Sequence, residues 1–222
     1  MTTMLLKNLI NNLKPNIPSP KIKGISFDSR NIKKGDLFVS IKGNTYDGND
    51  YIKQAVQKGA KAVVYSSPVK KNQKAIFIKV KNTRDTLAKL SAKYYVEKPK
   101  NIVAVTGTNG KTSVSDFFHQ IFILQKRRVG FIGTLGFKKN KFLKRRNLTT
   151  LDPVNLNKDL SNLKKSGINN VIIEASSHGL KQKRLDFLNI KAGIFTNLSI
   201  DHLDYHKNIV DYLNSKLLLF SN

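Results

Sequence analysis

The interpretation of this chain is decided by the stretch Thr106-Gly107-Thr108-Asn109-Gly110-Lys111-Thr112. It follows an apolar run, residues 102–105, that predicts a strand, and it precedes a segment with helical spacing. Glycines let the backbone approach an anion, Lys111 supplies a mobile positive charge, and the Thr112 hydroxyl suits Mg²⁺. The stretch therefore predicts a phosphate-binding loop at the end of a strand, with a nucleotide as its ligand.

The loop departs from the general P-loop pattern at one position. G-x-x-x-x-G-K-[ST] would place a glycine at position 105, where this chain has Val105. The alternative is a glycine-rich surface turn with a solvated lysine. The apolar strand before the loop and the amphipathic segment after it favour the phosphate site.

The composition sets limits on the class of protein. The chain has 222 residues, of which 40% are hydrophobic, so it is long enough for one large or two ordinary domains. It has no cysteine, which excludes a disulfide, a thiolate zinc site and a cysteine nucleophile. The first ten residues lack the apolar core of a signal peptide, and no window approaches the ~18 apolar residues of a membrane span. We therefore expect a cytoplasmic protein.

The net charge of +26 raises the alternative of a P-loop ATPase that works on nucleic acid. Such a protein would carry a localised basic stripe and stacking aromatic residues. Here the lysines are spread over nearly every polar segment, together with many asparagines and isoleucines. The densest cluster, residues 138–146, is predicted to be a solvated hairpin or loop. We therefore expect no nucleic-acid partner.

The pattern of apolar residues predicts two α/β domains, 1–98 and 99–222, because Pro99 interrupts a helical segment just before the loop strand. In the first, helices are predicted at 5–13, 51–58 and 82–95, and strands at 24–27, 37–41, 62–65 and 75–80. In the second, strands are predicted at 102–105, 129–133, 171–174 and 193–196, and helices at 113–127, 155–165 and 208–220.

The alternation in the second domain predicts a mostly parallel sheet with helices on both faces. Such sheets bind ligands at the carboxyl ends of their strands. The last predicted helix runs to the end of the sequence with no closing strand behind it. We therefore expect the sheet to be incomplete and the chain to be a fragment or a truncated product.

Two motifs follow predicted strands of this sheet. Glu174 ends an apolar strand, where a carboxylate is either a Mg²⁺ ligand or an ordinary cap or loop residue. Residues 201–206 contain two carboxylates and two imidazoles, and His202 follows Asp201 directly. We expect Glu174 and His202 to meet over the nucleotide, because one imidazole and one carboxylate beside substrate phosphates suit Mg²⁺.

With these motifs in view, the whole sequence resembles the Mur ligase family, the ATP-dependent amide-forming enzymes of peptidoglycan synthesis. The resemblance rests on the loop T-G-T-N-G-K-T and on further motifs in the same order and at similar spacing: Asp28-Ser29-Arg30, Gly35-Asp36-Leu37-Phe38, Thr149-Thr150, Glu174 to Gly179, Gln182, Arg184, Thr196 to His206 and Lys216.

The resemblance implies an ATP-dependent ligase that adds meso-diaminopimelate or L-lysine to UDP-N-acetylmuramoyl-L-alanyl-D-glutamate through an acyl phosphate. The first domain would bind the UDP group and the second ATP. The implied UDP-substrate residues are Phe27, Ser29, Asn44, Thr45, Tyr46, Thr149, Thr150, Ser176, Gln182 and Arg184. The implied ATP-binding residues are Thr106 to Thr112, the catalytic residues Lys111, Glu174, His202 and Lys216, and the Mg²⁺ ligands Thr112, Glu174, His202 and Lys216.

For Lys216, the role implied by the resemblance differs from the role that the local sequence predicts. Taken alone, it is a surface lysine on a predicted helix. The resemblance implies that it reacts with CO₂ to form N6-carboxylysine, an anionic oxygen ligand. The acceptor amino acid and the base that deprotonates its amine stay open, a monomer is the expected state, and a chain that only binds substrate and nucleotide is the alternative to a complete ligase.

Overall fold

The computed structural model describes residues 3–11, 13–43, 46–70, 74–139, 142–144 and 148–221. The chain divides into two compact units, Met1–Tyr94 and Tyr95–Asn222, which are described separately below. None of the helices in these ranges combines the length and the apolar character that crossing a bilayer requires.

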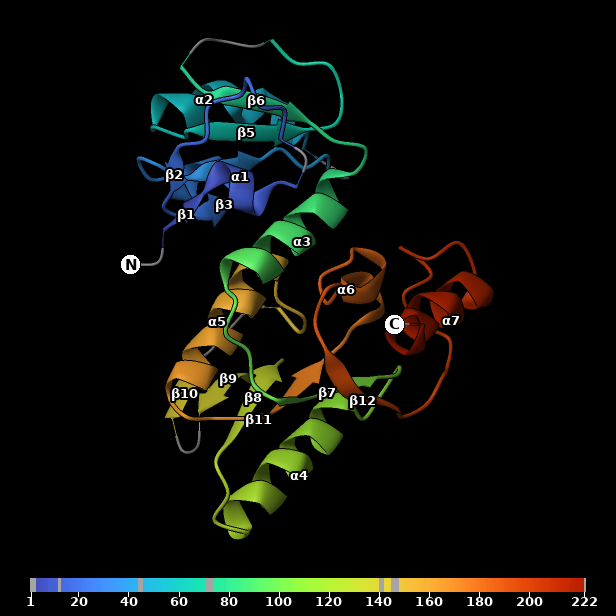
Figure 1. Cartoon of the computed structure of the whole chain (residues 1–222). Helices are drawn as coiled ribbons and strands as arrows, with labels where there is room; N and C mark the ends of the chain where they lie inside the picture. The colour runs from blue at the N-terminus through green and yellow to red at the C-terminus, as the bar shows by residue number, and fades with distance from the viewer. Residues whose placement is uncertain are drawn as a thin grey trace. The chain divides into compact units, whose positions relative to one another are not determined.

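The N-terminal unit is built on a parallel four-stranded sheet in the order β3-β4-β5-β6 (Figure 1). Its strands are β3 (Ile25–Ser26), β4 (Leu37–Val39), β5 (Ala62–Tyr65) and β6 (Ile76–Lys79). A short antiparallel pair, β1 (Met4–Leu5) with β2 (Lys21–Ile22), and the helices α1 (Leu6–Leu9), α2 (Ile52–Gln57) and α3 (Thr83–Tyr94) complete the unit. Ile52 and Val56 of α2 pack on Phe38 and Val63 of the sheet.

The prediction of a helix over residues 5–13 is wrong in its extent. Leu5 belongs to β1 and pairs with Lys21, and the helix α1 ends at Leu9 because Ile10 is extended. Leu6 and Leu9 are buried, so the apolar spacing reflects one turn of helix packed on the core. The other predicted helices and strands of this unit are present, with ends that differ by at most two residues from the prediction.

The C-terminal unit has a six-stranded sheet in the order β10-β9-β8-β11-β7-β12 (Figure 1). Four neighbouring strands are parallel: β8 (Val129–Gly133), β11 (Asn170–Glu174), β7 (Asn101–Thr106) and β12 (Ile190–Phe195). The hairpin β9 (Gly136–Lys139) and β10 (Phe142–Lys144) adds an antiparallel edge. This confirms a hairpin in the predicted lysine-rich cluster, whose Asn140, Lys141, Arg145 and Arg146 lie outside the described residues.

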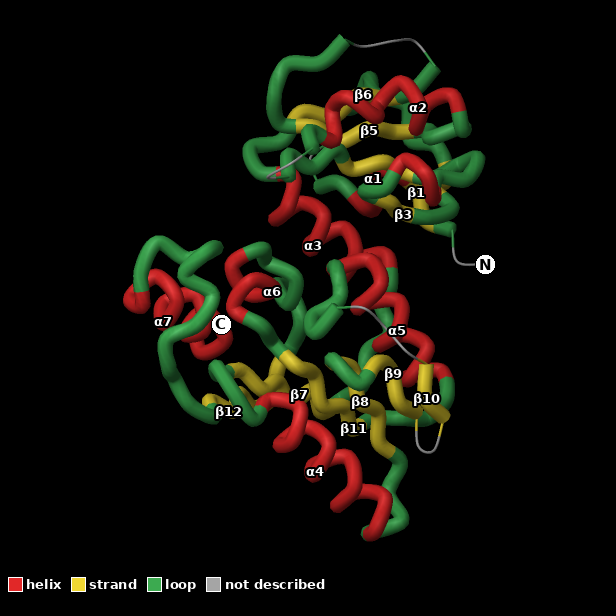
Figure 2. Tube along the Cα trace, turned by 180° about the vertical axis from the view of Figure 1, so that it is seen from behind, coloured by secondary structure: helices red, strands yellow, loops and turns green. Residues whose placement is uncertain are grey.

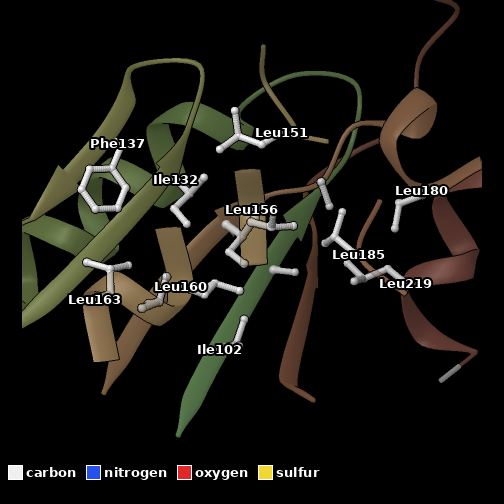
Figure 3. Packing of buried hydrophobic residues seen from close by; sticks show 14 of the residues in the cluster. Ile102, Ile132, Phe137, Leu151, Leu156, Leu160, Leu163, Leu180, Leu185 and Leu219 are labelled. Atoms are coloured by element: carbon white, nitrogen blue, oxygen red, sulfur yellow. The ribbon is translucent and has the colours of Figure 1, made fainter. Parts of the chain in front are cut away.

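Helices cover both faces of this sheet, as predicted (Figures 1 and 2). The helix α5 (Pro153–Lys165) places Leu156, Leu160 and Leu163 against Ile102 and Ile132 (Figure 3). The helix α4 (Lys111–Leu124) places Val114 and Phe118 on the opposite face, against Val105, Phe131 and Ile172. Alternate residues of β7 and β11 thus enter two different cores, as expected of strands buried on both sides.

Two helices lie beyond the sheet, α6 (Ser177–Lys181) and α7 (Ile209–Leu217), the latter followed by one 3₁₀ turn, Leu218–Phe220. They lie side by side in both views (Figures 1 and 2). The helix α6 was not predicted, because five residues are too few for a helical period to be visible. Its start is fixed by Ser176, whose hydroxyl accepts a hydrogen bond from Gly179 N.

Candidate functional site

The loop between β7 and α4, which the sequence predicts to bind phosphate, contains two glycines with positive φ. Gly107 has φ of 146° and Gly110 has φ of 80°, values that favour glycine, and Gly110 is the N-cap of α4. A Cβ on Gly107 would lie 1.9 Å from Thr196 Oγ1. The same hydroxyl donates to the carbonyl of Asn109 at 2.6 Å. The segment after β12 therefore packs tightly against the loop and holds its shape.

Lys111 folds back over this loop. Its Nζ donates to the carbonyls of Gly107 and Thr108, both at 2.8 Å. Burial lowers the pKa of Lys111, while the charges of Glu174 and Asp201 act in the opposite direction. The ammonium thus lies at the start of α4, where anions bind.

Glu174 ends β11 beside the loop and is fully buried. Its Oε2 accepts hydrogen bonds from Thr112 Oγ1 at 3.0 Å and from Thr134 Oγ1 at 2.9 Å, and its Oε1 accepts one from Thr134 N at 3.1 Å. Burial raises the pKa of this carboxyl, and the hydrogen bonds from Thr134 and Thr112 oppose that shift. A buried carboxylate bonded to neutral donors is a favourable place for a cation.

The oxygens of Thr112 and Glu174 fit a magnesium ion. Two neighbouring ligands of octahedral Mg²⁺, each ~2.0–2.1 Å from the metal, are separated by about 2.9 Å. Thr112 Oγ1 and Glu174 Oε2 are 3.0 Å apart. Within the described ranges no three histidine or carboxylate side chains converge as a ready metal cage. Mg²⁺ usually keeps several waters and shares substrate phosphates, so two protein oxygens are a common contribution to its site.

His202 lies in a separate cluster of aromatic side chains. Its ring centroid is 5.0 Å from that of His178 and 6.1 Å from that of Tyr212. Its φ of 52° is left-handed, and its backbone N–H donates to Asp201 Oδ1 at 2.8 Å. A non-glycine residue in this conformation carries backbone strain, a feature that clusters at functional sites.

Lys216 is buried, with an exposed fraction of 1%, so the surface position suggested by sequence alone is wrong. Its Nζ donates to the carbonyl of Gly107 at 2.6 Å and lies 4.2 Å from the centroid of the Tyr212 ring. Burial, and then the charge of Lys111, lower the pKa of Lys216 to about 8. A neutral amine is therefore accessible near physiological pH.

Five of the sequence-predicted substrate residues form one hydrogen-bonded group around Glu174: Thr149, Thr150, Ser176, Gln182 and Arg184. Thr150 Oγ1 donates to the backbone carbonyl of Glu174 at 2.9 Å and lies 3.0 Å from Ser176 Oγ. Arg184 Nη1 donates to the carbonyl of Thr150 at 2.6 Å, and its Nη2 donates to Gln182 Oε1 at 2.8 Å. Thr149 joins the group through Thr134, whose hydroxyl lies between Thr149 and the carboxylate of Glu174.

The remaining predicted residues belong to the N-terminal unit. Phe27 and Ser29 follow β3 at its carboxyl end, where Phe27 is partly exposed and the buried Ser29 donates to Gln54 Oε1 at 2.5 Å. Tyr46 is exposed. Asn44 and Thr45 lie outside the described residues. The two described aromatic side chains are available to a ligand in this unit.

Comparison with known protein families identifies the family of this chain. The model of the Mur ligase middle domain matches residues 105–222, more than half of the chain, and that of the Mur ligase family, catalytic domain, matches residues 21–95. The chain belongs to the Mur ligase family.

Several relatives within the family are named UDP-N-acetylmuramoyl-L-alanyl-D-glutamate–2,6-diaminopimelate ligase. The protein of Bradyrhizobium diazoefficiens is 40% identical over 98% of this chain and 45% of its own length. The protein of Rhizobium meliloti is 42% identical over 94% of this chain and 43% of its own length. This chain thus spans about half the length of the curated relatives it matches.

Solved structures agree with this assignment. A structure of the same kind of ligase matches 98% of this chain and 45% of its own length, with a TM-score of 0.83 and 30% identity. A MurF ligase from Thermotoga maritima, solved in complex with ADP, matches 88% of this chain and 42% of its own length, with a TM-score of 0.60 and 21% identity. The second likeness concerns the fold alone.

Sequence reasoning missed two residues of this Mur ligase site. Thr134 supplies two of the hydrogen bonds to Glu174, and Tyr212 lies under the amine of Lys216. Thr134 follows the predicted strand β8, so its place at the carboxyl end of a parallel strand was a usable signal. Tyr212 gave no comparable signal, because an aromatic residue on an amphipathic helix is usually part of a core.

Proposed function

We propose that this chain carries the UDP-substrate and ATP sites of a ligase that adds meso-diaminopimelate, or L-lysine, to UDP-N-acetylmuramoyl-L-alanyl-D-glutamate. The observation that carries the proposal is the meeting of a phosphate-binding loop, a buried carboxylate and a buried lysine within one site. The names of the relatives support UDP-N-acetylmuramoyl-L-alanyl-D-glutamate and diaminopimelate as the substrates. The proposed setting is the cytoplasm, and the proposed state is a monomer.

In the proposed first step, the terminal carboxylate of the substrate attacks the γ-phosphorus of ATP, which gives an acyl phosphate and releases ADP. Lys111 lies within reach of a phosphate bound at the start of α4, where its charge would stabilise the transferred phosphoryl group. To do so it must exchange the carbonyls of Gly107 and Thr108 for phosphate oxygens. In the second step the amine of the incoming amino acid attacks the activated carbonyl and displaces phosphate.

Thr112 and Glu174 are the proposed holders of Mg²⁺, on the fit of their oxygens described above. When bound, the ion would neutralise charge on the transferred phosphoryl group. Thr134 keeps the carboxylate of Glu174 facing Thr112. His202 is proposed as a further ligand, because it lies beside Asp201 in the segment that follows β12.

Lys216 is proposed to become N6-carboxylysine. The neutral amine forms a C–N bond to CO₂ and releases one proton to solvent, so that a cation is replaced by an anionic group with two oxygen atoms. The lowered pKa of Lys216, about 8, supports the supply of neutral amine for this reaction. The resulting oxygens would give a second Mg²⁺ a ligand next to the loop.

The substrate itself is proposed to be held in two places. Thr149, Thr150, Ser176, Gln182 and Arg184 would bind the muramoyl-dipeptide part near Glu174. Phe27, Ser29, Asn44, Thr45 and Tyr46 would bind the UDP part in the N-terminal unit. The names of the relatives favour diaminopimelate over L-lysine as the incoming amino acid.

Lys111→Ala tests the proposal. We expect this variant to lose substrate-dependent release of ADP from ATP, while binding of the UDP-linked substrate, followed by calorimetry, stays close to that of the wild type. The matched control is Lys165→Ala, which removes an exposed lysine at the end of α5. Normal ADP release by Lys111→Ala would overturn the assignment of the loop. Measuring ADP separates phosphoryl transfer from completion of the amide bond.

A further inference from the structure

Tyr212 is the largest fully buried side chain among the described residues, yet it ends in a hydroxyl that needs a partner. The partner is Thr108 of the phosphate-binding loop, whose Oγ1 lies 3.2 Å from the phenol oxygen. A phenylalanine would fill the same space without any polar contact. The contact therefore points to a link between α7 and the loop.

The hydroxyl of Thr108 is saturated by three partners. It donates its one hydrogen to the carbonyl of Ser199 at 3.3 Å. Its two lone pairs accept from Ser199 N at 3.0 Å and from Tyr212 OH at 3.2 Å. Tyr212 is thus the donor, and Thr108 joins the loop, the segment after β12 and α7.

The ring of the same tyrosine supports Lys216. The two residues are four apart on α7 and so share one face of the helix. Lys216 Nζ lies 4.2 Å from the ring centroid and donates to the carbonyl of Gly107. The helix therefore contacts two consecutive loop residues, Gly107 through the amine and Thr108 through the phenol.

We propose that Tyr212 is a positioning residue with two separable parts: its hydroxyl fixes the phosphate-binding loop through Thr108, and its ring holds the amine of Lys216 against the loop. This assignment deepens the proposed function, on which it rests for the roles of the loop and of Lys216. The hydroxyl governs nucleotide affinity, because it sets the backbone that receives the phosphates. The ring governs access to the amine, because it covers one side of Nζ.

The test compares Tyr212→Phe, which keeps the ring, with Tyr212→Leu, which removes it. Two quantities are measured on the 222-residue chain: the Kd of a fluorescent ATP analogue with Mg²⁺, and the rate at which acetyl N-hydroxysuccinimide ester modifies Lys216, read by mass spectrometry. For Tyr212→Phe we expect the Kd to rise about 2- to 10-fold, as for the loss of one neutral hydrogen bond, with unchanged acetylation. For Tyr212→Leu we expect the Kd to rise and acetylation to accelerate roughly tenfold, because the amine becomes accessible.

Thr108→Val provides the reciprocal change. Thr108→Val alone should raise the Kd. In the double variant with Tyr212→Phe, the fold-increase in Kd should be smaller than the product of the two single fold-increases, since both substitutions break the same contact. Tyr65→Phe is the control: Tyr65 is a buried tyrosine of β5 in the N-terminal unit and should change neither quantity. Unfolding curves of all variants identify any loss of the fold.

The proposal is overturned if Tyr212→Phe binds the nucleotide like the wild type, or if it accelerates acetylation as much as Tyr212→Leu does. Equal movement of both quantities in both variants would indicate a general packing role. Neither measurement uses the UDP-linked substrate, so failure of ligation leaves the result intact. The acetylation measurement also needs no nucleotide, and therefore tests the role of the ring even if the wild type binds no ATP.

Discussion

At the scale of single residues, the site depends on how a buried carboxylate is oriented. Thr134 donates to Glu174 through both its backbone N–H and its hydroxyl, and that hydroxyl also lies 3.0 Å from Thr149 Oγ1. It therefore connects the proposed Mg²⁺ ligand with the proposed substrate residues. No other described residue makes two hydrogen bonds to this carboxylate.

Thr134→Val removes the hydroxyl and preserves the shape of the side chain. We expect the free energy of unfolding to fall by roughly 1–3 kcal/mol, because a buried charged acceptor loses a donor. We also expect the Mg²⁺ concentration needed for half-maximal binding of an ATP analogue to rise. Urea unfolding and a Mg²⁺ titration measure the two effects. Thr134→Ser keeps the hydroxyl and should restore both values, so equal behaviour of the Val and Ser variants would contradict this role.

At the scale of elements, β7, its loop and α4 act as one unit, and two glycines in the loop face different constraints. A Cβ on Gly107 would meet Thr196 Oγ1 at 1.9 Å, whereas a Cβ on Gly110 would have only an ordinary contact at 3.9 Å. Both residues have positive φ, so alanine carries a backbone penalty at either position. Only Gly107 adds a clash with the segment after β12.

Gly110→Ala is expected to lower the free energy of unfolding by about 1–2 kcal/mol, the cost of a left-handed alanine. Gly107→Ala should lower it by more and should also abolish binding of an ATP analogue, because the loop must move away from Thr196. Urea unfolding and nucleotide titration of the two variants make the comparison. A Gly107→Ala variant that binds nucleotide as well as Gly110→Ala would show that the loop shape is not set by this contact.

The elements also show how far sequence reasoning reaches. The strands β5 and β8 were predicted with the bounds that the structure has, because each is a continuous apolar run between turn residues. The helix α4 begins two residues before the predicted Ser113, at Lys111, because Gly110 caps it directly. The pair β1 and β2 and the helix α6 were missed, since elements of two to five residues show no period.

The candidate site divides in the same way. The loop and Glu174 could be predicted because their chemistry follows a strand in the sequence. Lys216 and Tyr212 could not be derived from local patterns, because tertiary contacts bury them and supply their partners. A buried lysine on an amphipathic helix cannot be told from a surface lysine until the loop carbonyl that it contacts is known.

At the scale of the whole molecule, the net charge of +26 favours attraction of any polyanion. Lysines lie on the surface of both units, as shown by exposed residues such as Lys21 and Lys53 in one and Lys126 and Lys158 in the other. Lysines spread in this way attract a polyanion, but they do not fix the position in which it binds. It equally favours approach of an anionic substrate that carries a diphosphate.

We therefore expect binding of mixed-sequence single-stranded DNA that is weak and non-specific, with a Kd of about 10⁻⁴ to 10⁻⁶ M at physiological salt, and that weakens steeply as salt is raised. Because phosphate contacts alone would carry this binding, it should not change the rate of ATP hydrolysis. Fluorescence anisotropy over a series of salt concentrations measures the binding, and an ADP assay with and without DNA measures the coupling. Saturable stimulation of ATP hydrolysis by DNA or RNA, without any response to the UDP-linked substrate, would instead favour an ATPase that works on nucleic acid.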